Sequence, residues 1–208
     1  MNVLVVDDHA IVRQGLRQIL VESGKVMNVG EAEHGAEAIR QVREGGWDVV
    51  VLDISLPDRN GIEILKQIRK ESPKTRVLML SMHDEGLFAI RALKAGASGY
   101  ITKQSAPGEL MAAIQQVARG RKYLTAAMAE AMADSLGEDH DRPPHEMLSD
   151  REYQTLCLIA SGKSLTDAAE EMRLSVKTVS VYRSRLLEKM KLKNNAELTH
   201  YAIKNGLA

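Results

Sequence analysis

Five polar residues follow short apolar runs in the first half of the chain, and their chemical types belong together. Asp7 and Asp8 come directly after the first run, and Asp53 comes directly after the third. Ser81 follows the fourth run and Lys103 follows the fifth. Ligands of an open α/β sheet bind at the carboxyl ends of its strands, so we expect these five side chains to converge on one surface.

Three carboxylates, one hydroxyl and one ammonium are the groups that phosphoryl transfer onto an aspartate requires. Clustered carboxylates repel one another and stay ionised beside a cation, and oxygen ligands alone favour a hard ion such as Mg²⁺. A carboxylate beside Mg²⁺ can attack a phosphoryl group and form an acyl phosphate. The metal, the ammonium and the hydroxyl then neutralise the phosphoryl oxygens. The pattern therefore predicts a Mg²⁺-dependent phosphoacceptor site.

The distribution of charge divides the chain into three parts, although the formal net charge is zero. Residues 1–124 carry a net charge of +2, residues 125–148 carry −5 and residues 149–208 carry +3. Residues 173–193 contain seven basic side chains and one acidic side chain. Such a basic stripe suits the phosphate backbone of a nucleic acid, and a merely solvated helix face is the alternative for the stripe taken alone.

Apolar runs alternate with stretches of helical spacing over the first 120 residues. Several runs are rich in Val, Ile and Leu without polar alternation, which is typical of strands buried on both faces of a parallel sheet. Between the first two runs, Val12, Leu16 and Leu20 share one side of a helix. Five such repeats predict an α/β fold, a doubly wound (βα)5 parallel-sheet domain. The expected strands are residues 2–6, 26–30, 47–52, 76–80 and 98–101.

The middle of the chain is expected to connect two domains. The Ala- and Met-rich residues 121–136 are expected to be helical. Residues 137–144 are polar and acidic and end in Pro143 and Pro144, so they predict a linker whose proline pair is extended.

From residue 148 onward the pattern contains no strand signal, and three or four helices fit. Ser149 and Glu152 have the spacing of a capping box at the start of the first helix. Leu174 and Ser175 interrupt two helical patterns, and Ser175 is a suitable cap for the next helix. This region therefore predicts an all-α helix-turn-helix domain with a recognition helix over residues 175–190.

The motifs of the first half resemble the receiver domain of two-component response regulators. They are Val-Asp-Asp-His at residues 6–9, Leu-Asp-Ile-Ser-Leu-Pro at 52–57, Leu-Ser-Met at 80–82 and Gly-Tyr-Ile-Thr-Lys at 99–103. The resemblance implies that a sensor histidine kinase phosphorylates Asp53 and that Lys103 contacts the phosphoryl group. It implies a switch pair, Ser81 and Tyr100. The implied Mg²⁺ ligands are Asp7, Asp8, Asp53 and the backbone carbonyl of Ser55.

The second half resembles the LuxR-type helix-turn-helix of the NarL/FixJ class of response regulators. The motifs are Leu-Ser-Asp-Arg-Glu at residues 148–152, Ile-Ala-Ser-Gly-Lys-Ser at 159–164 and Leu-Ser-Val-Lys-Thr-Val at 174–179. The resemblance implies binding to double-stranded DNA as a homodimer, with the last helix contributing dimer contacts. The recognition-helix residues expected at DNA are Lys177, Thr178, Ser180, Val181, Tyr182, Arg183, Ser184 and Arg185.

Other features narrow the class of protein. The first apolar run ends at two acids without a basic leader, so we expect no signal peptide, and no apolar run is long enough to span a membrane. The single cysteine, Cys157, lies among apolar residues and is expected to be buried, which fits a reducing cytoplasm. The six histidines lack the spacing of a metal site, and His83 is expected at the surface.

Two competing functions remain to be weighed against a phosphorylation-gated, non-enzymatic transcription regulator. A phosphatase of the haloacid dehalogenase type also uses carboxylates and Mg²⁺, but it needs its nucleophile after the first strand, within Asp-x-Asp. A scaffold that binds partners without DNA is the other alternative. The expected domains are a receiver at residues 1–120, a linker at 121–147 and a helix-turn-helix domain at 148–208.

Overall fold

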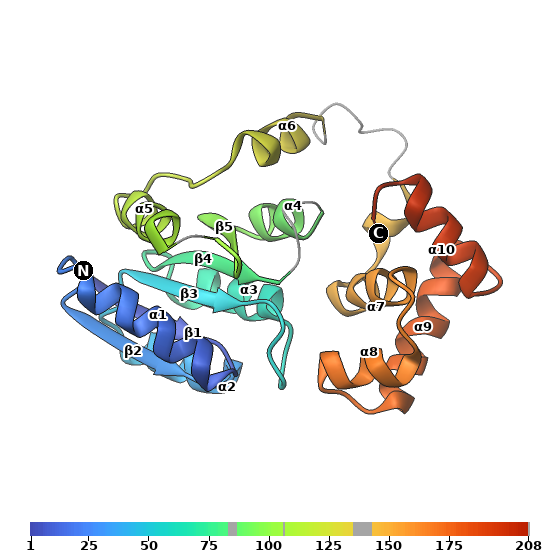
Figure 1. Cartoon of the computed structure of the whole chain (residues 1–208), viewed down its shortest axis with the longest axis horizontal. Coiled ribbons are helices and arrows are strands. Elements are labelled where there is room, and N and C mark those ends of the chain that lie inside the picture. Colours follow the sequence, from blue (N-terminus) through green and yellow to red (C-terminus); the bar gives the residue numbers. More distant parts are fainter. Residues whose placement is uncertain (83–86, 106, 135–142, 208) are drawn as a thin grey trace. The chain divides into compact units, whose positions relative to one another are not determined.

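The computed structural model describes residues 1–82, 87–105, 107–134 and 143–207. The chain forms two compact units, Met1–Ala133 and Asp134–Ala208, which we describe separately. Figure 1 shows a layered α/β unit and a smaller unit made of helices. The α/β class and the all-α second domain predicted from the sequence are confirmed.

The first unit is built on a five-stranded parallel sheet. Its strand order is β2-β1-β3-β4-β5, and each strand pairs in parallel with its neighbour. This is the doubly wound arrangement predicted from the sequence. The strands are β1 (Asn2–Val6), β2 (Asn28–Ala32), β3 (Val49–Asp53), β4 (Arg76–Ser81) and β5 (Gly99–Thr102).

Five helices cover the two faces of this sheet. Helices α1 and α5 pack against one another and against the strands on one face, while α2, α3 and α4 form a row on the other (Figure 1). Burial on both faces explains why the central strands are almost entirely aliphatic. The helices are α1 (Ala10–Glu22), α2 (Gly35–Glu44), α3 (Gly61–Glu71), α4 (Leu87–Lys94) and α5 (Pro107–Ala118).

Alternate residues of each strand point to opposite faces, so each strand supplies two hydrophobic cores. On the α1 and α5 side, Val5, Val51 and Leu80 pack with Leu20 and Ile114, and all are buried. Fully burying such a side chain contributes roughly 1.5–3 kcal/mol. These cores hold the carboxyl ends of the strands in register, and the polar residues that follow them are therefore held in fixed positions.

Strand β2 begins two residues later than the sequence predicted, because its register with β1 pairs Asn2 with Asn28 and Val6 with Ala32. Gly30 lies in the middle of this strand. A Cβ atom there would lie 2.3 Å from the indole of Trp47, so the close approach of Trp47 requires glycine. The predicted boundary of this strand, residues 26–30, is therefore corrected.

The helix expected over residues 121–136 begins later in the structure, where α6 spans Ala126–Asp134, and residues 135–136 lie outside the described residues. The chain first returns to the sheet, because the Tyr123 amide donates to the Ser98 carbonyl at 2.9 Å and Gly99 bridges Tyr123 in parallel. This pairing at the edge of the sheet prevents helix formation at Tyr123. Helix α6 then begins where the Thr125 hydroxyl accepts the Met128 amide at 3.3 Å.

The second unit contains a short 3-10 helix, η1 (Pro144–Met147), followed by four α-helices. Pro143 is extended as predicted, but Pro144 instead begins η1, where a missing amide hydrogen costs nothing. The rest of the predicted linker, residues 137–142, lies outside the described residues. The α-helices are α7 (Asp150–Ala160), α8 (Leu165–Met172), α9 (Val176–Met190) and α10 (Asn195–Lys204).

The hydrogen bonds at the start of α7 agree with the cap predicted from the sequence. Ser149 and Glu152 form both hydrogen bonds of the predicted capping box at the start of α7. Cys157 is buried within α7, as expected. None of the helices in the described ranges combines the length and the apolar character needed to cross a membrane.

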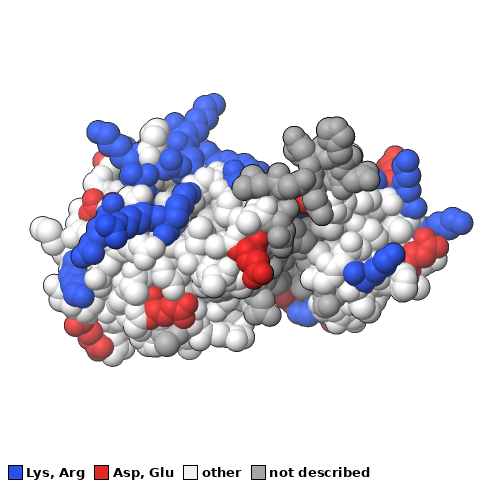
Figure 2. Space-filling model, turned by 90° about the horizontal axis from the view of Figure 1, so that it is seen from above, with Lys and Arg blue, Asp and Glu red and all other residues white. Residues whose placement is uncertain are grey.

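Basic side chains are not confined to the second unit. Figure 2 shows Lys and Arg side chains gathered on one face of the first unit. The end of α5 leads into Arg119, Arg121 and Lys122, which are all exposed. Although the Lys122 residue is exposed as a whole, its ammonium donates to the Ala97 carbonyl in a partly buried position. Desolvation of this ammonium, together with the nearby Arg69 and Arg76, lowers the pKa of Lys122. Basic side chains gathered on one face can add a salt-dependent attraction to polyanions.

Candidate functional site

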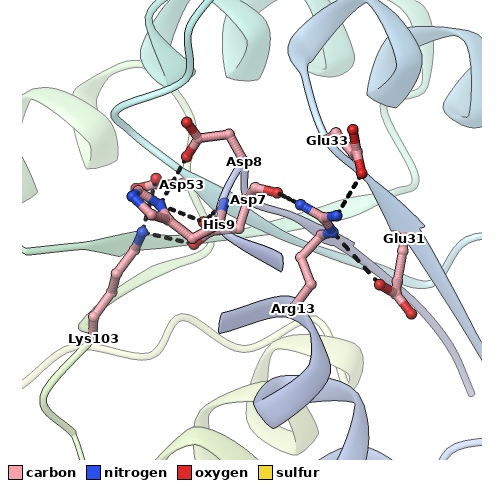
Figure 3. A network of polar contacts seen from close by, with 8 residues as sticks. All are labelled: Asp7, Asp8, His9, Arg13, Glu31, Glu33, Asp53 and Lys103. Atoms are coloured by element: carbon pink, nitrogen blue, oxygen red, sulfur yellow. Dashed lines mark hydrogen bonds and ion pairs between the residues drawn. The ribbon is translucent and has the colours of Figure 1, made fainter. Parts of the chain in front are cut away.

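The carboxyl ends of β1 and β3 bring two buried carboxylates together. These strands are neighbours, with Val6 paired to Leu52, so Asp7 and Asp53 follow adjacent positions in the sheet. Both are essentially inaccessible to solvent, and the Asp8 side chain is 3% exposed. The ends of the two strands thus bring Asp7, Asp8 and Asp53 together in one cluster, called the acid pocket below and drawn in Figure 3.

Lys103 supplies the positive charge of this acid pocket. Its Nζ atom lies 2.6 Å from Oδ2 of Asp7 and 2.9 Å from Oδ2 of Asp53. The residue follows β5, and its amide donates to the Ser81 carbonyl at 2.7 Å, which fixes the backbone from which the long side chain extends. Lys103 reaches the pocket from the strand-end position that the sequence indicated.

The electrostatics of the pocket follow from burial and from this pairing. Burial raises the pKa of Asp53, and the Lys103 ammonium and the Ser55 backbone amide act in the opposite direction without reversing the shift. Burial acts to lower the pKa of Lys103, but the charges and hydrogen bonds of Asp53 and Asp7 outweigh it and raise that pKa. A further positive charge beside Asp53 would favour its ionised form.

Of the remaining predicted residues, Ser81 lies at the carboxyl end of a strand and Ser55 just after one. Ser81 is buried at the end of β4 and is paired in register with Thr102 of β5. Tyr100 is fully buried within β5. Ser55 forms an isolated bridge with Asn60 in the loop after β3. His83 lies outside the described residues.

Two residues next to the pocket were not predicted from the sequence as part of it. His9 lies with Nδ1 3.1 Å from Asp7 Oδ1 and 2.9 Å from Asp8 Oδ1 (Figure 3). Arg13 of α1 is 6% exposed and donates to the Asp7 backbone carbonyl at 2.7 Å. It also contacts Glu33 of the loop after β2 at 2.7 Å. The motif Asp-Asp-His-x-x-x-Arg carried both residues, but nothing in it indicated their orientation.

The donor atoms of the pocket suit a hard divalent cation. One ligand atom from each of Asp7, Asp8, His9 and Asp53 can be chosen so that all lie within 4.8 Å of one another. Three of the four residues are carboxylates, which are preferred ligands of oxygen-seeking ions. The residues present therefore fit the kind of cation that the sequence predicted.

In the second unit, α8 and α9 form the predicted helix-turn-helix. Arg173 ends α8 in the left-handed region with φ of 52°, and the chain turns through Leu174. The Ser175 side chain then accepts the Thr178 amide at the start of α9. Helix α9 begins at Val176 and ends at Met190, which confirms the predicted helix to within one residue.

One side of α9 is anchored in the core. Val179, Leu186 and Met190 are buried, as predicted. Tyr182 is half-buried and packs against the cluster formed by α7, α8 and α9. The Arg183 Nε donates to the Asn195 side chain of α10 at 2.6 Å, so this predicted DNA residue is engaged within the domain.

The opposite side of α9 is open. Lys177, Val181, Ser184 and Arg185 are exposed, while Thr178 and Ser180 are partly exposed. The Ser184 hydroxyl donates to the Ser180 carbonyl at 3.0 Å, and the Thr178 hydroxyl lies 2.8 Å from that of Ser175. Figure 1 shows α9 with α8 and α10 in the helical unit. An exposed basic helix after a tight turn has the form required to enter a major groove.

Comparison with known families assigns both units. The family model described as "Response regulator receiver domain" matches residues 3–115. The model described as "Bacterial regulatory proteins, luxR family" matches residues 146–202. These matches agree with the two resemblances seen in the sequence.

Relatives match over the full chain. The response regulator UvrY of Escherichia coli (strain K12) is 38% identical over 208 residues, covering 100% of this chain and 95% of UvrY. The response regulator GacA of Pseudomonas viridiflava is 33% identical over 208 residues, covering 100% of this chain and 97% of GacA. The two domains of this chain thus occur together in proteins of similar length.

Solved structures of response regulators share the fold. RcsB from Salmonella enterica serovar Typhimurium, bound to promoter rprA in the presence of the phosphomimetic BeF3-, matches with a TM-score of 0.65 and 27% identity over 97% of both chains. A LuxR-family response regulator from Aurantimonas matches with a TM-score of 0.58 and 38% identity, covering 66% of this chain and 98% of that chain.

This assignment decides between the competing functions. Response regulators are signalling proteins, so the phosphatase reading is set aside, and the LuxR-family match sets aside a scaffold without DNA binding. The chain belongs to the two-component response regulator family, in its NarL/FixJ class, and joins a receiver domain to a LuxR-type DNA-binding domain.

Proposed function

We propose that a sensor histidine kinase phosphorylates this chain on Asp53 and that phosphorylation controls dimerisation and DNA binding. The observation that carries the proposal is a buried carboxylate, Asp53, paired at 2.9 Å with a buried lysine, Lys103. Buried charges of this kind are costly and concentrate at functional sites. The full-length match to UvrY and GacA, both response regulators, supports the same conclusion.

In the proposed step, a carboxylate oxygen of Asp53 forms a bond to phosphorus. The bond between phosphorus and the donor imidazole nitrogen breaks, and the electron pair leaves with the imidazole. Lys103 already touches the Asp53 oxygen, so its ammonium is in place to neutralise a phosphoryl oxygen. Because the ammonium also binds Asp7, it does not have to be brought in from solvent.

For the cofactor we propose Mg²⁺, held by Asp7, Asp8, Asp53 and the backbone carbonyl of Ser55. The support is the donor set, since the three carboxylates converge and offer oxygen ligands. When bound, Mg²⁺ supplies positive charge next to the phosphoryl oxygens. Asp7 and Asp53 each keep one oxygen on Lys103, so protein charge and metal charge would share the two carboxylates.

We propose that Ser81 and Tyr100 convert phosphorylation into a change of surface. Ser81 ends β4 beside the pocket, and Tyr100 lies on the neighbouring strand β5. Movement of the Ser81 hydroxyl toward the phosphoryl group would change the space available to the aromatic ring. The face formed by α4 and β5 would then differ between the two states, as a population shift between two conformations.

We propose that α9 reads double-stranded DNA in the major groove. Lys177 and Arg185 would contact phosphates, and Ser180, Val181 and Ser184 would face bases. Thr178, Tyr182 and Arg183 would contact the backbone, and Arg183 also donates its Nε to the Asn195 side chain. Structures of RcsB with DNA, including two RcsB dimers on two parallel DNAs, support a homodimer on DNA.

The proposed domains are a receiver at residues 1–120, a linker at 121–147 and a DNA-binding domain at 148–208. Support comes from the receiver match ending at residue 115 and from α7 beginning at Asp150. Because both DNA and the phosphorylating part of a sensor kinase are found in the cytoplasm, we propose that this chain acts there.

The proposal is tested by labelling Asp53. Incubation of the full chain with a small phosphodonor and Mg²⁺ is expected to add one phosphoryl group that is lost under mild alkali, as expected for an acyl phosphate. Asp53→Asn is expected to abolish the mass increase seen by intact mass spectrometry. Asp58→Asn is the matched control, because Asp58 instead accepts the Gly35 and Ala36 amides at 2.9 Å. Unchanged labelling of Asp53→Asn would refute the site.

A further inference from the structure

Three basic side chains lie together at the amino ends of β4 and β5, the end of the sheet opposite the acid pocket. Arg76 is the first residue of β4. Arg69 of α3 donates to the Thr75 carbonyl, just before that strand, at 3.2 Å. The Lys122 ammonium donates to the Ala97 carbonyl, two residues before β5. Desolvation and then the positive charges of Arg69 and Arg76 lower the pKa of Lys122, so the three side chains are near neighbours.

The segment after α5 adds two arginines to the same end of the sheet. Arg119 and Arg121 are exposed, and Tyr123 bridges β5 in parallel, which fixes this segment against the sheet. A Cβ atom at Gly120 would lie 3.5 Å from Nη2 of Arg76, so the segment passes beside that side chain. We call the five side chains the basic cluster: Arg69, Arg76, Arg119, Arg121 and Lys122.

No carboxylate of the described residues balances the basic cluster. Within those ranges, none of its five members forms an ion pair with Asp or Glu. Other exposed arginines of the receiver are paired in this way. Arg17 lies 3.5 Å from Glu31, and Arg40 lies 3.4 Å from Glu37. The positive charge that gathers on the first unit (Figure 2) is therefore least compensated at the basic cluster.

The composition of this surface favours a nucleic acid over a protein as its partner. Protein interfaces have an apolar core inside a polar rim. The large apolar side chains that are exposed in the described residues all lie outside residues 69–76, 94–98 and 119–123, which surround the cluster. Basic side chains without an apolar centre suit a ladder of phosphates, and duplex DNA carries one negative charge per roughly 1.7 Å of its axis.

Duplex DNA is also the polyanion that the LuxR-type unit brings to this chain. Once that unit holds a duplex, the tethered receiver meets the flanking DNA at a high effective concentration, so a few weak phosphate contacts add to the affinity. We propose that the basic cluster is a second DNA-contacting surface, which binds phosphates beside the sequence contacted by α9. The inference rests on the DNA binding proposed for α9. Phosphate contacts add affinity without sequence preference.

The test uses the full phosphorylated chain and two lengths of one duplex, which that chain has selected from a random pool. The short form has about 20 base pairs, enough for two half-sites one helical turn apart, and the long form adds about 20 base pairs at each end. Fluorescence anisotropy over a salt series measures binding. On the long duplex, Arg119→Gln combined with Arg121→Gln should flatten the salt slope by about two units, one for each lost phosphate contact. On the short duplex the slope should stay within about half a unit of the parent value.

Arg17→Gln combined with Arg40→Gln is the matched control. It removes the same net charge from arginines that are already paired with glutamates, so both slopes should stay within about half a unit of the parent values. If the Arg119 and Arg121 variant keeps the parent slope on the long duplex, the basic cluster does not contact DNA. An equal loss with the control variant, or on both lengths of duplex, would also overturn the inference.

A further variant separates this inference from the proposed function. Lys177→Ala changes α9 alone and should flatten the slope on both lengths of duplex by about one unit. If Lys177→Ala has this effect and the Arg119 and Arg121 variant has none, the second surface is wrong and DNA binding by α9 stands. If Lys177→Ala has no effect on either duplex, the DNA binding proposed for α9 is wrong and the inference falls with it.

Discussion

Two cationic side chains bind Asp7, one at its main chain and one at its carboxylate. Arg13 binds its backbone carbonyl at 2.7 Å, and Lys103 binds its carboxylate at 2.6 Å. Its amide donates to Ala32 of β2 at 3.2 Å. These contacts come from α1, β2 and the end of β5, so the orientation of one carboxylate depends on three separate elements.

Replacing Arg13 is expected to destabilise the receiver. Arg13→Met keeps the apolar stem but leaves the Asp7 carbonyl without its charged donor, so the free energy of unfolding should fall by about 2 kcal/mol. Arg17→Met is the control, because Arg17 is 52% exposed and also contacts Glu31. It should change stability by less than about 0.5 kcal/mol. Urea unfolding followed through Trp47, the single tryptophan, measures both, and equal effects would contradict the role of Arg13.

Individual residues of α9 are expected to act differently on DNA. Lys177 and Arg185 are eight residues apart, within about 80° around the helix, and both are exposed. Lys177→Ala should weaken binding about equally on specific and random duplexes and flatten the salt slope by about one unit. Ser184→Ala should leave the slope unchanged and alter preference at one base position by at most roughly 1 kcal/mol.

Fluorescence anisotropy over a salt series on both duplexes measures these effects. Each variant is compared with the parent, so that any contribution to the slope from the basic side chains on the first unit (Figure 2) cancels. If Lys177→Ala changes neither affinity nor slope, α9 does not lie in a groove.

At the scale of elements, α7 and α9 are joined through one carboxylate. Glu152 accepts from the Ser149 amide at 2.8 Å and from Lys189 at 2.6 Å, so it both caps α7 and binds α9. Lys189 is thereby engaged within the domain. Burial acts to raise the pKa of Glu152, but the hydrogen bonds with Lys189 and Ser149 outweigh it and lower that pKa.

This linkage predicts acid sensitivity of the DNA-binding domain. Because the pKa of Glu152 is lower in the folded domain, its stabilisation of the folded domain is fully present above the unfolded-state pKa of about 4.5. This stabilisation is lost as the pH falls through the folded-state pKa. Glu152→Gln should lower the Tm at pH 7. Acidification should then lower the Tm of this variant by less than it lowers the Tm of the parent. Circular dichroism melts at pH 7 and pH 4 measure this, with Trp47 fluorescence reporting the receiver separately. Parallel pH profiles of the two proteins would contradict it.

The elements differ in how well the sequence predicted them. Strands β1, β3 and β4 were recognisable because burial on both faces requires aliphatic runs. Their carboxyl ends, where ligands of such sheets bind, then located Asp7, Asp53 and Ser81. Strand β2 is partly exposed, and its bounds depend on register with β1. The start of α6 depends on the bridge between Tyr123 and Gly99, a contact that no local pattern encodes.

The same limit applies to the pocket. A charged residue in an amphipathic helix ordinarily faces water, yet Arg13 is buried because Asp7 and Glu33 surround it. Its burial follows from tertiary partners rather than from helix periodicity. His9 lacks the spacing of a recognised metal motif and joins the pocket only because β1 ends three residues before it, at Val6.

At the scale of the whole molecule, phosphorylation and DNA binding are expected to be coupled. The phosphorylated chain is first used to select a duplex from a random pool. This duplex should bind the phosphorylated form at least about fivefold more tightly than the unmodified form, which corresponds to the lower end of typical coupling free energies. Asp53→Asn should bind with the same affinity whether or not the phosphodonor is present. Anisotropy titrations measure both, and equal affinities of the two parent forms would remove the switch from the mechanism.

Asp53 and Lys103 are 50 residues apart in the sequence. This separation determines the order in which the charges of the pocket are made during synthesis. A nascent chain that has been made only through β4 already contains Asp7 and Asp53 but lacks the ammonium that neutralises them. Burying both carboxylates in that state is opposed by their mutual repulsion. The last strand therefore completes the pocket electrostatically as well as structurally, so phosphorylation of Asp53 is expected only after β5 and Lys103 are in place.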